Sequence, residues 1–245
     1  MRLKAPETIT FAPTPFCPGC GHGIASRMIA EIVEELHMRE DFIPVVDVAC
    51  GALTMDIWRY DTVMAAHGRP IDAAIGVKKV RKDKLVAAYL GDGAAYAIGM
   101  SETMHAALRN DNIVVIVVNN GVFGMTGGQM APTTLPGQKT TSSPKGRDPK
   151  KQGNPFDVTK ALKEMEIAYL ARASLGSPKA VIKASSYIKK AFKKQMNKEG
   201  FCLVELLAPC PTNWGLSPVE SLEHIKKDTL SYYQLGEFID KKEEC

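Results

Sequence analysis

Two short apolar runs with a helical segment between them form the clearest hydrophobic pattern of the chain. Leu85 to Leu90 is too short for a buried helix and is followed at once by glycine, whereas Ile113 to Val118 consists entirely of β-branched residues. Between them, small and apolar residues from position 97 to 108 recur at three- and four-residue intervals. This pattern predicts two parallel strands, buried on both faces and joined by a helix, as a right-handed βαβ unit.

The rest of the chain alternates between helical and strand patterns. The predicted further strands are Val45–Val48, Ala168–Leu175 and Phe201–Leu207, and the predicted further helices are Ile24–Met38, one beginning near Ile71, Phe156–Glu166, Pro178–Asn197 and Pro218–Leu230. Such alternation indicates an α/β fold, a single doubly wound domain with a mainly parallel sheet. We expect residues 1–16, which contain three prolines, to form an extended arm, and residues 17–245 to form the domain.

Polar residues follow both strands of the βαβ unit, as Gly91-Asp92-Gly93 and Asn119-Asn120. In an open parallel sheet, ligands bind at the carboxyl ends of the strands. Two glycines at the start of a helix let a phosphate approach the free N–H groups. A carboxylate beside a phosphate is repulsive unless a cation separates them, and an amide oxygen adds an uncharged ligand. The pattern therefore predicts Mg²⁺ bridging Asp92 and Asn120 to a diphosphate; no G-x-G-x-x-G motif indicates a dinucleotide instead.

Composition and charge exclude several other classes of protein. The chain has 245 residues, of which 45% are hydrophobic and 24% are charged, as in an ordinary globular protein. A net charge of +4 with scattered basic residues does not indicate nucleic-acid binding. Neither a signal peptide nor an apolar run of membrane-spanning length is present, so we expect no membrane association and a cytoplasmic location.

Four of the six cysteines occupy positions suited to a common metal or cluster site: Cys17, Cys20, Cys50 and Cys210. The first two form a C-x-x-C motif before a helix, the third ends the Val45–Val48 strand, and the fourth lies between prolines that stiffen its loop. Zinc and a [4Fe–4S] cluster both accept four thiolates, so spacing alone leaves both open. Cys202 lies in a strand pattern and is expected to be a buried core thiol, and the terminal Cys245 is expected to be mobile.

These motifs resemble a known family. The GDG motif, followed by a helix, a strand and NN, closely resembles the thiamine diphosphate signature, in which the Asp and the second Asn hold the metal. The residue two beyond that Asn, here Val122, adds a backbone carbonyl. From Cys17 to about Phe238, CPGCGHG, VACG, HGR, GDG, NNGVFGMTGGQ and APCPTNWG occur in the order found in the thiamine-binding β subunit of 2-oxoacid:ferredoxin oxidoreductases.

The resemblance implies a set of site residues. Cys17, Cys20, Cys50 and Cys210 would carry one [4Fe–4S] cluster close to the thiamine. The residues that match thiamine contacts are Val48, Ala49, Cys50, Gly51, His67, Gly91, Gly93, Ala94, Gly124, Met125 and Thr126. Two of them are the candidate catalytic residues: His67, favoured as a thiamine contact over a base, and Met125, which could press the thiamine rings into a bent form or simply pack in its loop.

The implied activity is the oxidative decarboxylation of a 2-oxoacid to acyl-CoA and CO₂, with single electrons passing through the cluster to ferredoxin. CPTNWGLSPVE and YYQLGEF in the tail are most similar to the branched-chain members, which favours 2-oxoisovalerate. An α subunit would supply the pyrimidine-binding domain and the activating carboxylate, and a ferredoxin-like subunit or free ferredoxin would accept electrons. The alternatives are a non-redox thiamine carboligase or decarboxylase with structural zinc, and a catalytically inactive iron–sulfur binding module.

Two features stay open at this level. Residues 131–155, the basic segment, show no periodicity and contain Lys139, Lys145, Arg147, Lys150 and Lys151 against one acidic residue. We interpret the segment first as a solvated surface, and otherwise as a lid, a subunit contact or a site for CoA phosphates. His22, beside the C-x-x-C motif, is expected either to bond a cluster sulfur or to cap the following helix.

Overall fold

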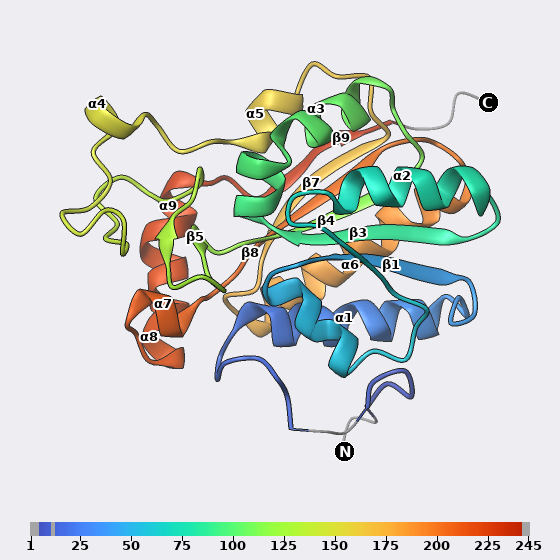
Figure 1. Ribbon diagram of the computed structural model, residues 1–245, viewed down its shortest axis with the longest axis horizontal. Helices are drawn as coiled ribbons and strands as arrows, with labels where there is room; N and C mark the ends of the chain where they lie inside the picture. Colours follow the sequence, from blue (N-terminus) through green and yellow to red (C-terminus); the bar gives the residue numbers. More distant parts are fainter. Residues whose placement is uncertain (1–4, 11–12, 242–245) are drawn as a thin grey trace.

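The computed structural model describes residues 5–10 and 13–241, and within them a seven-stranded sheet forms the centre of the molecule (Figure 1). The strand order is β2-β1-β3-β4-β8-β7-β9, and only β9 is antiparallel to its neighbour. The strands are β1 (Phe42–Asp47), β2 (Val63–Ala65), β3 (Leu85–Gly91), β4 (Val114–Asn119), β7 (Tyr169–Ser174), β8 (Cys202–Leu207) and β9 (Gly236–Asp240). The predicted fold class, a doubly wound α/β domain with a mainly parallel sheet, is confirmed.

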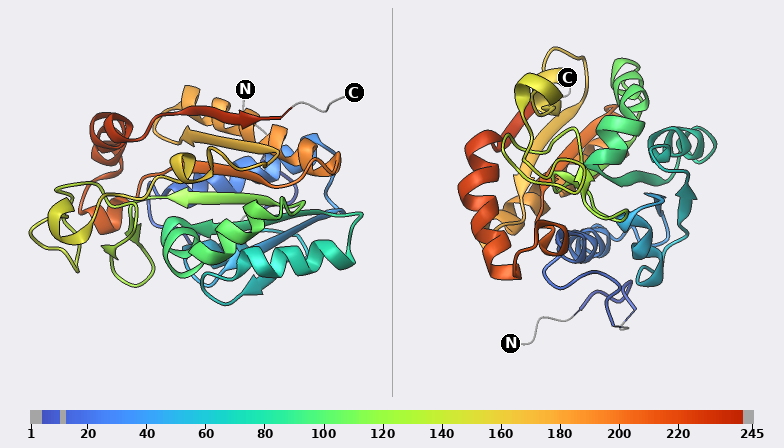
Figure 2. Two further views of the ribbon diagram at one scale, coloured as in Figure 1. Left: turned by 90° about the horizontal axis from the view of Figure 1, so that it is seen from above. Right: turned by 60° about the vertical axis from the view of Figure 1, so that its left-hand side comes forward.

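Helices cover both faces of this sheet (Figure 2). One face packs against α1 (Gly21–Glu35) and α6 (Pro178–Met196), and the other against α2 (Pro70–Val80), α3 (Met100–Leu108) and α5 (Val158–Leu162). None of the helices in the described residues is long and apolar enough to cross a membrane.

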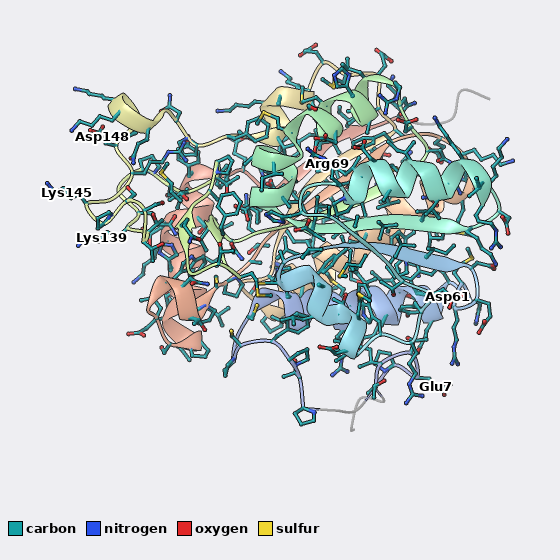
Figure 3. All side chains as sticks on the ribbon, in the orientation of Figure 1. Glu7, Asp61, Arg69, Lys139, Lys145 and Asp148 are labelled. Carbon is teal, nitrogen blue, oxygen red and sulfur yellow. The ribbon has the colours of Figure 1, made fainter. Side chains whose placement is uncertain are left out.

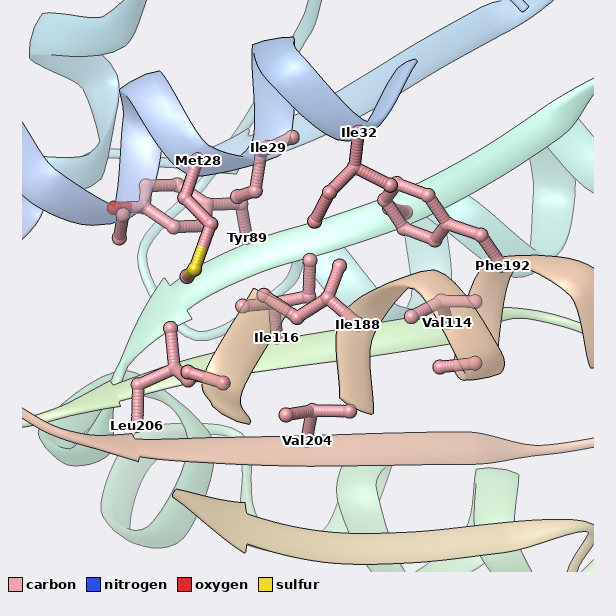
Figure 4. Close-up of a cluster of buried hydrophobic side chains, with 14 of the residues drawn as sticks. Met28, Ile29, Ile32, Tyr89, Val114, Ile116, Ile188, Phe192, Val204 and Leu206 are labelled. Carbon is pink, nitrogen blue, oxygen red and sulfur yellow. The ribbon is translucent and has the colours of Figure 1, made fainter. Parts of the chain in front are cut away.

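The two apolar cores follow from the alternation of side chains along each strand. In β4, Ile116 and its alternate neighbours point toward α1 and α6, whereas Val115 and Val117 point toward α2 and α3. Figure 4 shows the first of these cores, in which Ile29 of α1 and Phe192 of α6 meet the strand side chains. Because both faces of β3 and β4 are buried, these strands appear in the sequence as continuous apolar runs. Burying each side chain of this size contributes about 1.5–3 kcal/mol.

The prediction for β1 was wrong at both ends. The strand begins at Phe42 rather than Val45, because Pro44 is tolerated inside it. Strand β2 pairs with β1 only from Val45 onward, so β1 is an edge strand at Pro44, where a missing N–H leaves no partner unpaired. The strand also ends at Asp47, and Cys50 opens a 3-10 helix, η1 (Cys50–Asp56), instead of ending the strand.

Several helix boundaries also differ from those predicted. Helix α1 begins three residues before Ile24, and the segment before α3 starts as a π-helical turn, η2 (Ala94–Ile98). Helix α5 is shorter than the predicted Phe156–Glu166. The predicted C-terminal helix is divided into α8 (Pro218–His224), the π-helical η3 (Ile225–Thr229) and α9 (Leu230–Tyr232).

Some short elements were not predicted at all. Strands β2 and β9 occupy the two edges of the sheet, and the two-residue strands β5 (Val122–Phe123) and β6 (Gln129–Met130) form a separate antiparallel pair. Two short helices complete the fold, α4 (Pro149–Gln152) and α7 (Pro211–Trp214). At the N-terminal side, residues 5–10 lie against the domain: the Thr8 N–H donates to Glu34 Oε1 at 2.8 Å.

Candidate functional site

The carboxyl ends of β3, β4 and β8 lie side by side and determine the geometry of the site. Gly91 of β3 pairs with Val118 of β4, and Asn119 of β4 pairs with Leu207 of β8. Asp92 therefore leaves β3 at the level where β4 continues into its pair of asparagines. The loop after β8 carries the last of the four predicted thiolates, so the register of the sheet brings all three segments to one edge.

Asp92 is the buried acidic group of this edge, with 1% of its surface exposed. Its Oδ2 accepts a hydrogen bond from the Thr133 hydroxyl, and its Oδ1 lies 3.5 Å from the Asn120 backbone nitrogen. Burial raises the pKa of Asp92 to about 7, because desolvation disfavours the charged carboxylate. A divalent cation beside it would favour ionisation again, so the residue fits the predicted role of magnesium ligand.

Hydrogen bonds within the chain shape the turn after β4. The Asn120 side-chain oxygen accepts the Val122 N–H at 3.2 Å, and the Trp214 indole N–H donates to the Asn120 carbonyl at 3.1 Å. Gly121, between Asn120 and Val122, has a φ of 70°, a backbone conformation that favours glycine. Carboxylate, amide and backbone oxygens are the ligand types that Mg²⁺ prefers. We call Asp92, Asn120 and Val122 the cation side of the site.

A pocket of about 280 Å³ opens beside these residues. Fourteen of its seventeen lining residues are those predicted to contact thiamine or magnesium: Val48, Ala49, Cys50, Gly51, His67, Gly91, Asp92, Gly93, Ala94, Asn120, Val122, Gly124, Met125 and Thr126. Three more complete the lining: His22, Asp47 and Phe123. The structure thus brings every predicted thiamine and magnesium residue to one cavity, while their contacts with a bound cofactor remain predictions.

The two glycines of the GDG motif have different surroundings. A Cβ on Gly93 would lie 2.3 Å from the Phe123 ring, so packing within the chain requires glycine there. A Cβ on Gly91 would meet nothing closer than the Val118 carbonyl at 3.9 Å. Gly91 therefore leaves open space at the pocket wall, as expected where a phosphate approaches the backbone.

His67 is held in place by a buried carboxylate that sequence analysis did not identify. Its Nδ1 lies 2.7 Å from Asp47 Oδ2, and Asp47 Oδ1 accepts the Gly68 N–H at 2.8 Å. Asp47 is fully buried, and burial raises its pKa, although the Gly68 N–H and His67 act in the opposite direction. The Asp47 carboxylate fixes the ring of His67 and leaves Nε2 for contact with a ligand. Met125, by contrast, is 50% exposed and lines the pocket, and its role toward thiamine stays a prediction.

His22 lies in the first turn of α1 and is buried. Its Nδ1 is 2.7 Å from the Tyr89 hydroxyl, and the helix has no side-chain cap, so the capping alternative was wrong. Burial lowers the pKa of His22 to about 4, which keeps the imidazole neutral near pH 7. A bond from His22 to a cluster sulfur remains a prediction.

We call the four predicted thiolates the thiol side of the site; of the four, Cys50 lines the pocket. Cys17, Cys20, Cys50 and Cys210 are all free thiols. The pKa of Cys20 is raised to about 12 and that of Cys50 to about 11, chiefly by burial, with smaller contributions from other thiols of the set. Among the described residues, no three His, Cys, Asp or Glu side chains are placed to hold a single metal ion.

Close backbone packing brings the thiol segments together. The Cys20 N–H donates to the Cys17 carbonyl, and the Gly21 N–H donates to the Pro209 carbonyl, each at 3.0 Å. A Cβ on Gly21 would lie 2.5 Å from the Ala208 Cβ, so only glycine lets α1 begin this close to the loop after β8. The C-x-x-C turn and the loop of Cys210 are therefore joined by the glycine that follows the motif.

Gly124 and Asn213 connect the thiol side with the pocket. A Cβ on Gly124 would lie 3.4 Å from Cys50 Sγ and 3.8 Å from Cys210 Sγ, so both sulfurs face this glycine. The Asn213 amide donates to the Gly124 carbonyl at 3.0 Å and to Cys210 Sγ at 3.3 Å. Two sulfurs that face one glycine, one of them beside an N–H donor, fit part of the ligand set of an iron–sulfur cluster, whose potential depends on such donors. Cys202 is fully buried in β8, as predicted, and Cys245 lies outside the described residues.

The basic segment, residues 131–155, was only partly predicted. Figure 1 shows it extending with α4 away from the sheet, and Figure 3 places Lys139, Lys145 and Asp148 at its far end. Arg147 does not belong to a solvated surface: it is buried and donates to the carbonyls of Pro132, Thr134 and Asn154 at 2.7–2.9 Å, among others. Its guanidinium organises the segment internally, because it satisfies carbonyls that no helix or strand would satisfy.

Sequence reasoning missed several residues with direct contacts in the site, among them Asp47, Thr133 and Asn213. Asp47 had a usable signal, since it is a polar residue at the carboxyl end of a parallel strand. Asn213 stands in the APCPTNWG motif, but nothing in the motif shows that its amide faces a sulfur. Thr133 lies in a segment without periodicity and contacts Asp92 across 41 residues of chain. Only the folded chain shows that contact.

Comparisons with known proteins agree with this geometry. Residues 50–206 match the family model of the thiamine pyrophosphate enzyme, C-terminal TPP binding domain. A solved structure of 2-oxoglutarate:ferredoxin oxidoreductase from Magnetococcus marinus, with 2-oxoglutarate, coenzyme A and succinyl-CoA bound, shares the fold. It superposes with a TM-score of 0.80 and 23% identity over 99% of this chain and 87% of that one. The chain is thus a thiamine pyrophosphate-binding domain protein.

Curated relatives narrow the class. The chain is 36% identical over 232 residues to the ketoisovalerate oxidoreductase subunit VorA of Methanothermobacter thermautotrophicus, covering 94% of this chain but only 49% of that protein. It is 34% identical over 216 residues to the 2-oxoglutarate synthase subunit KorB of Archaeoglobus fulgidus, covering 88% and 77%. The chain therefore belongs to the thiamine-binding subunits of 2-oxoacid:ferredoxin oxidoreductases, as the motifs predicted. It spans about half the length of the VorA relative.

Proposed function

We propose that this chain is the β subunit of a 2-oxoacid:ferredoxin oxidoreductase that oxidatively decarboxylates 2-oxoisovalerate. The enzyme would convert the 2-oxoacid and CoA to acyl-CoA, CO₂ and a proton, and would pass two electrons, one at a time, to ferredoxin. The observation that carries the proposal is the position of Cys50. It lines the pocket, and its sulfur and that of Cys210 both lie beside Gly124, so cofactor and cluster would share a wall.

The residues divide the work between the two sides of the pocket. When bound, thiamine diphosphate supplies the electron sink for decarboxylation, and a [4Fe–4S] cluster accepts single electrons. Asp92, Asn120 and Val122 would hold Mg²⁺ against the diphosphate, which Gly91 admits to the backbone. His67, oriented by its buried carboxylate partner, would contact the bound cofactor through Nε2. The thiol side, Cys17, Cys20, Cys50 and Cys210, would hold the cluster.

The lining of the pocket supports an apolar substrate side chain. Val48 and Met125 are exposed apolar side chains at the rim, and Phe123 contributes an aromatic ring. A branched aliphatic group would bury apolar surface against them, whereas a second carboxylate would need a basic partner. This character, together with the ketoisovalerate relative, favours 2-oxoisovalerate over 2-oxoglutarate.

The proposed enzyme needs at least one other polypeptide or domain. The thiamine ring requires a carboxylate on its aminopyrimidine, and we propose that an α subunit supplies it on a pyrimidine-binding domain. A ferredoxin-like subunit or free ferredoxin would receive the electrons. We propose that the complex works in the cytoplasm and that this chain alone does not turn over; CoA-dependent turnover by the isolated chain would refute the last point.

Anaerobic purification of the native complex tests the proposal. We expect CoA-dependent reduction of a viologen dye, fastest with 2-oxoisovalerate and slower with 2-oxoglutarate and pyruvate. Iron and labile sulfide should be present in equal amounts and bound to this subunit. A protein that contains only zinc would instead indicate a non-redox carboligase or decarboxylase. A protein that contains iron and sulfide but fails to bind thiamine diphosphate with Mg²⁺ would indicate a binding module.

A further inference from the structure

The start of the basic segment belongs to the interior of the protein. Thr133 and Thr134 are buried, and each hydroxyl donates to a group at the edge of the pocket. Thr133 donates to Asp92 Oδ2, and Thr134 donates to the carbonyl of Gly121. The segment therefore closes over the back of the cation side, although its tip extends away from the domain.

Tyr233, at the end of α9, holds the backbone of Thr133 in place. Its hydroxyl lies 3.0 Å from the Thr133 carbonyl and 3.1 Å from the Phe156 carbonyl, so one proton is shared between two acceptors. The Tyr233 side chain is buried, and its ring lies under the Arg172 guanidinium at 4.7 Å. A buried tyrosine with both its ring and its hydroxyl engaged has little freedom to move.

Arg172 is itself fixed by carboxylates. It donates to Glu205 and, at 2.6 Å, to Asp157 Oδ1. Glu205 also accepts the Asn119 amide at 2.9 Å, at the end of β4. The same buried ion pairs thus contact the end of β4, which leads into Asn120, and the ring of Tyr233, whose hydroxyl bonds the Thr133 carbonyl. Such a network is rigid because each charge is paired and hydrogen-bonded.

We propose that Thr133 is a positioning residue for the Asp92 carboxylate, and that Tyr233 keeps Thr133 within reach of it. The inference rests on the proposed role of Asp92 as a magnesium ligand. With Oδ2 held by a hydroxyl, the carboxylate cannot rotate freely, and Oδ1 stays in a fixed position for the cation. Groups that orient a metal ligand in this way typically change metal affinity by about 10–100-fold when they are removed.

Magnesium-dependent binding of thiamine diphosphate by the purified complex tests the role of Thr133 without any turnover measurement. Thr133→Val keeps the shape but removes the donor, and should weaken the apparent Mg²⁺ affinity by about 10–100-fold. Thr133→Ser restores the hydroxyl and should recover most of the affinity. Thr141→Val, at an exposed threonine of the same segment, is the matched control and should bind like the wild type.

A double-mutant cycle separates positioning from a general loss of structure. With Asp92→Asn in the background, Thr133→Val should cause little further loss, because the group that it orients has changed. Equal losses in both backgrounds would show that Thr133 acts through folding alone, and would overturn the inference. Wild-type affinity in Thr133→Val would overturn it as well.

Adjacent tyrosines test the second part. Tyr233→Phe keeps the ring under Arg172 and removes only the hydroxyl, so it should weaken Mg²⁺ affinity less than Thr133→Val does, by several-fold. Tyr232→Phe, at the exposed neighbour, should have no effect. Identical binding by the two tyrosine variants would remove Tyr233 from the inference. A wild-type complex that takes up no Mg²⁺ with thiamine diphosphate would instead refute the proposed function itself.

Discussion

The cation side of the pocket joins strand ends that already adjoin in the sheet, whereas the thiol side gathers three segments that are distant in sequence. Asp92 and Asn120 follow paired strands, and side-chain hydrogen bonds hold both of them. The thiol side depends on backbone contact at Gly21 and on one amide, from Asn213.

This difference concerns what holds each side of the site together. On the cation side, hydrogen bonds within the chain hold both Asp92 and Asn120. On the thiol side, burial raises the pKa values of Cys20 and Cys50, so the thiols are protonated near pH 7 until a metal replaces their protons. We therefore expect the cation side to tolerate loss of its ligand and the thiol side to depend on it.

The largest effect should follow from removing one ligand on the thiol side. Cys210→Ser replaces a soft thiolate with a hydroxyl that binds iron poorly, so the variant should lose its cluster and its CoA-dependent viologen reduction. Iron and sulfide analysis after anaerobic purification measures this. Cys202→Ser, at the buried core thiol, should retain both; a colourless Cys202 variant beside a brown Cys210 variant would reverse the assignment.

Smaller losses of stability or of cofactor binding are expected from variants of the two glycines that flank Asp92. Gly93→Ala places a Cβ against the Phe123 ring and should lower the free energy of unfolding by about 1–3 kcal/mol, with loss of cofactor binding. Gly91→Ala meets no atom of the chain closely, so stability should stay within about 0.5 kcal/mol of the wild type. It should still weaken thiamine diphosphate binding, because the Cβ occupies the space left for phosphate. Unchanged cofactor affinity in Gly91→Ala would contradict that role.

Asp47→Asn tests the orientation of His67. The amide keeps an acceptor for the Gly68 N–H but turns an NH₂ group toward the imidazole, so His67 should lose its fixed orientation. We expect kcat to fall by roughly tenfold, equivalent to about 1.4 kcal/mol, with cofactor binding nearly unchanged. Steady-state viologen assays of the complex measure this loss, and Asp61→Asn, at an exposed aspartate, is the control. Wild-type kcat in Asp47→Asn would show that His67 needs no such partner.

The smallest effect is expected far from both sides, at β9. Burial alone would raise the pKa values of Glu237 and Asp240, but hydrogen bonds to Lys190 lower both below their usual 4.5 and 3.8. A carboxylate whose pKa is lowered by folding stabilises the fold fully at pH values above its usual pKa. This contribution is lost as the pH falls through the lowered pKa of the folded state. Lys190→Gln should therefore cost about 0.5 kcal/mol at pH 7 and nothing near pH 2, measured by calorimetry.

Lys139→Gln provides the baseline for that experiment, since this exposed lysine has no ion pair among the described residues. It should leave stability unchanged at both pH values. If the Lys190→Gln variant is as stable as the Lys139→Gln variant at pH 7, the ion pairs of β9 contribute nothing measurable to the stability of the fold.

The central part of the fold was predictable because its residues are buried on both faces. The predicted strands at 85–90 and 113–118 differ from β3 and β4 by only a residue at their ends. The edges were not predictable in the same way. Strand β9 reads Gly-Glu-Phe-Ile-Asp, without apolar alternation. It pairs with β7, packs Phe238 and Ile239 against the core and forms ion pairs with Lys190 of α6. Pro44 concealed the start of β1, because its tolerance depends on where the neighbouring strand begins.

The candidate site divides in a similar way. Residues within motifs were found because glycine, aspartate and cysteine leave a chemical signal in the sequence, and the structure places the predicted thiamine and magnesium residues around one pocket. Residues that position them were not found, because their role depends on distance in the fold. Asp47 and His67 are 20 residues apart, and Asn213 and Gly124 are 89 apart. No local pattern encodes such pairs.

Cys17 differs from the other three thiols of its group in being exposed. A cluster bound there would have one corner at the protein surface, where an electron could leave for a docked acceptor over a short path. The same opening would admit dioxygen, so damage to the cluster should begin at this corner. Fast electron transfer and sensitivity to air would then both result from a single exposed sulfur. Covering that sulfur would protect the cluster from dioxygen but would also slow electron transfer to the acceptor.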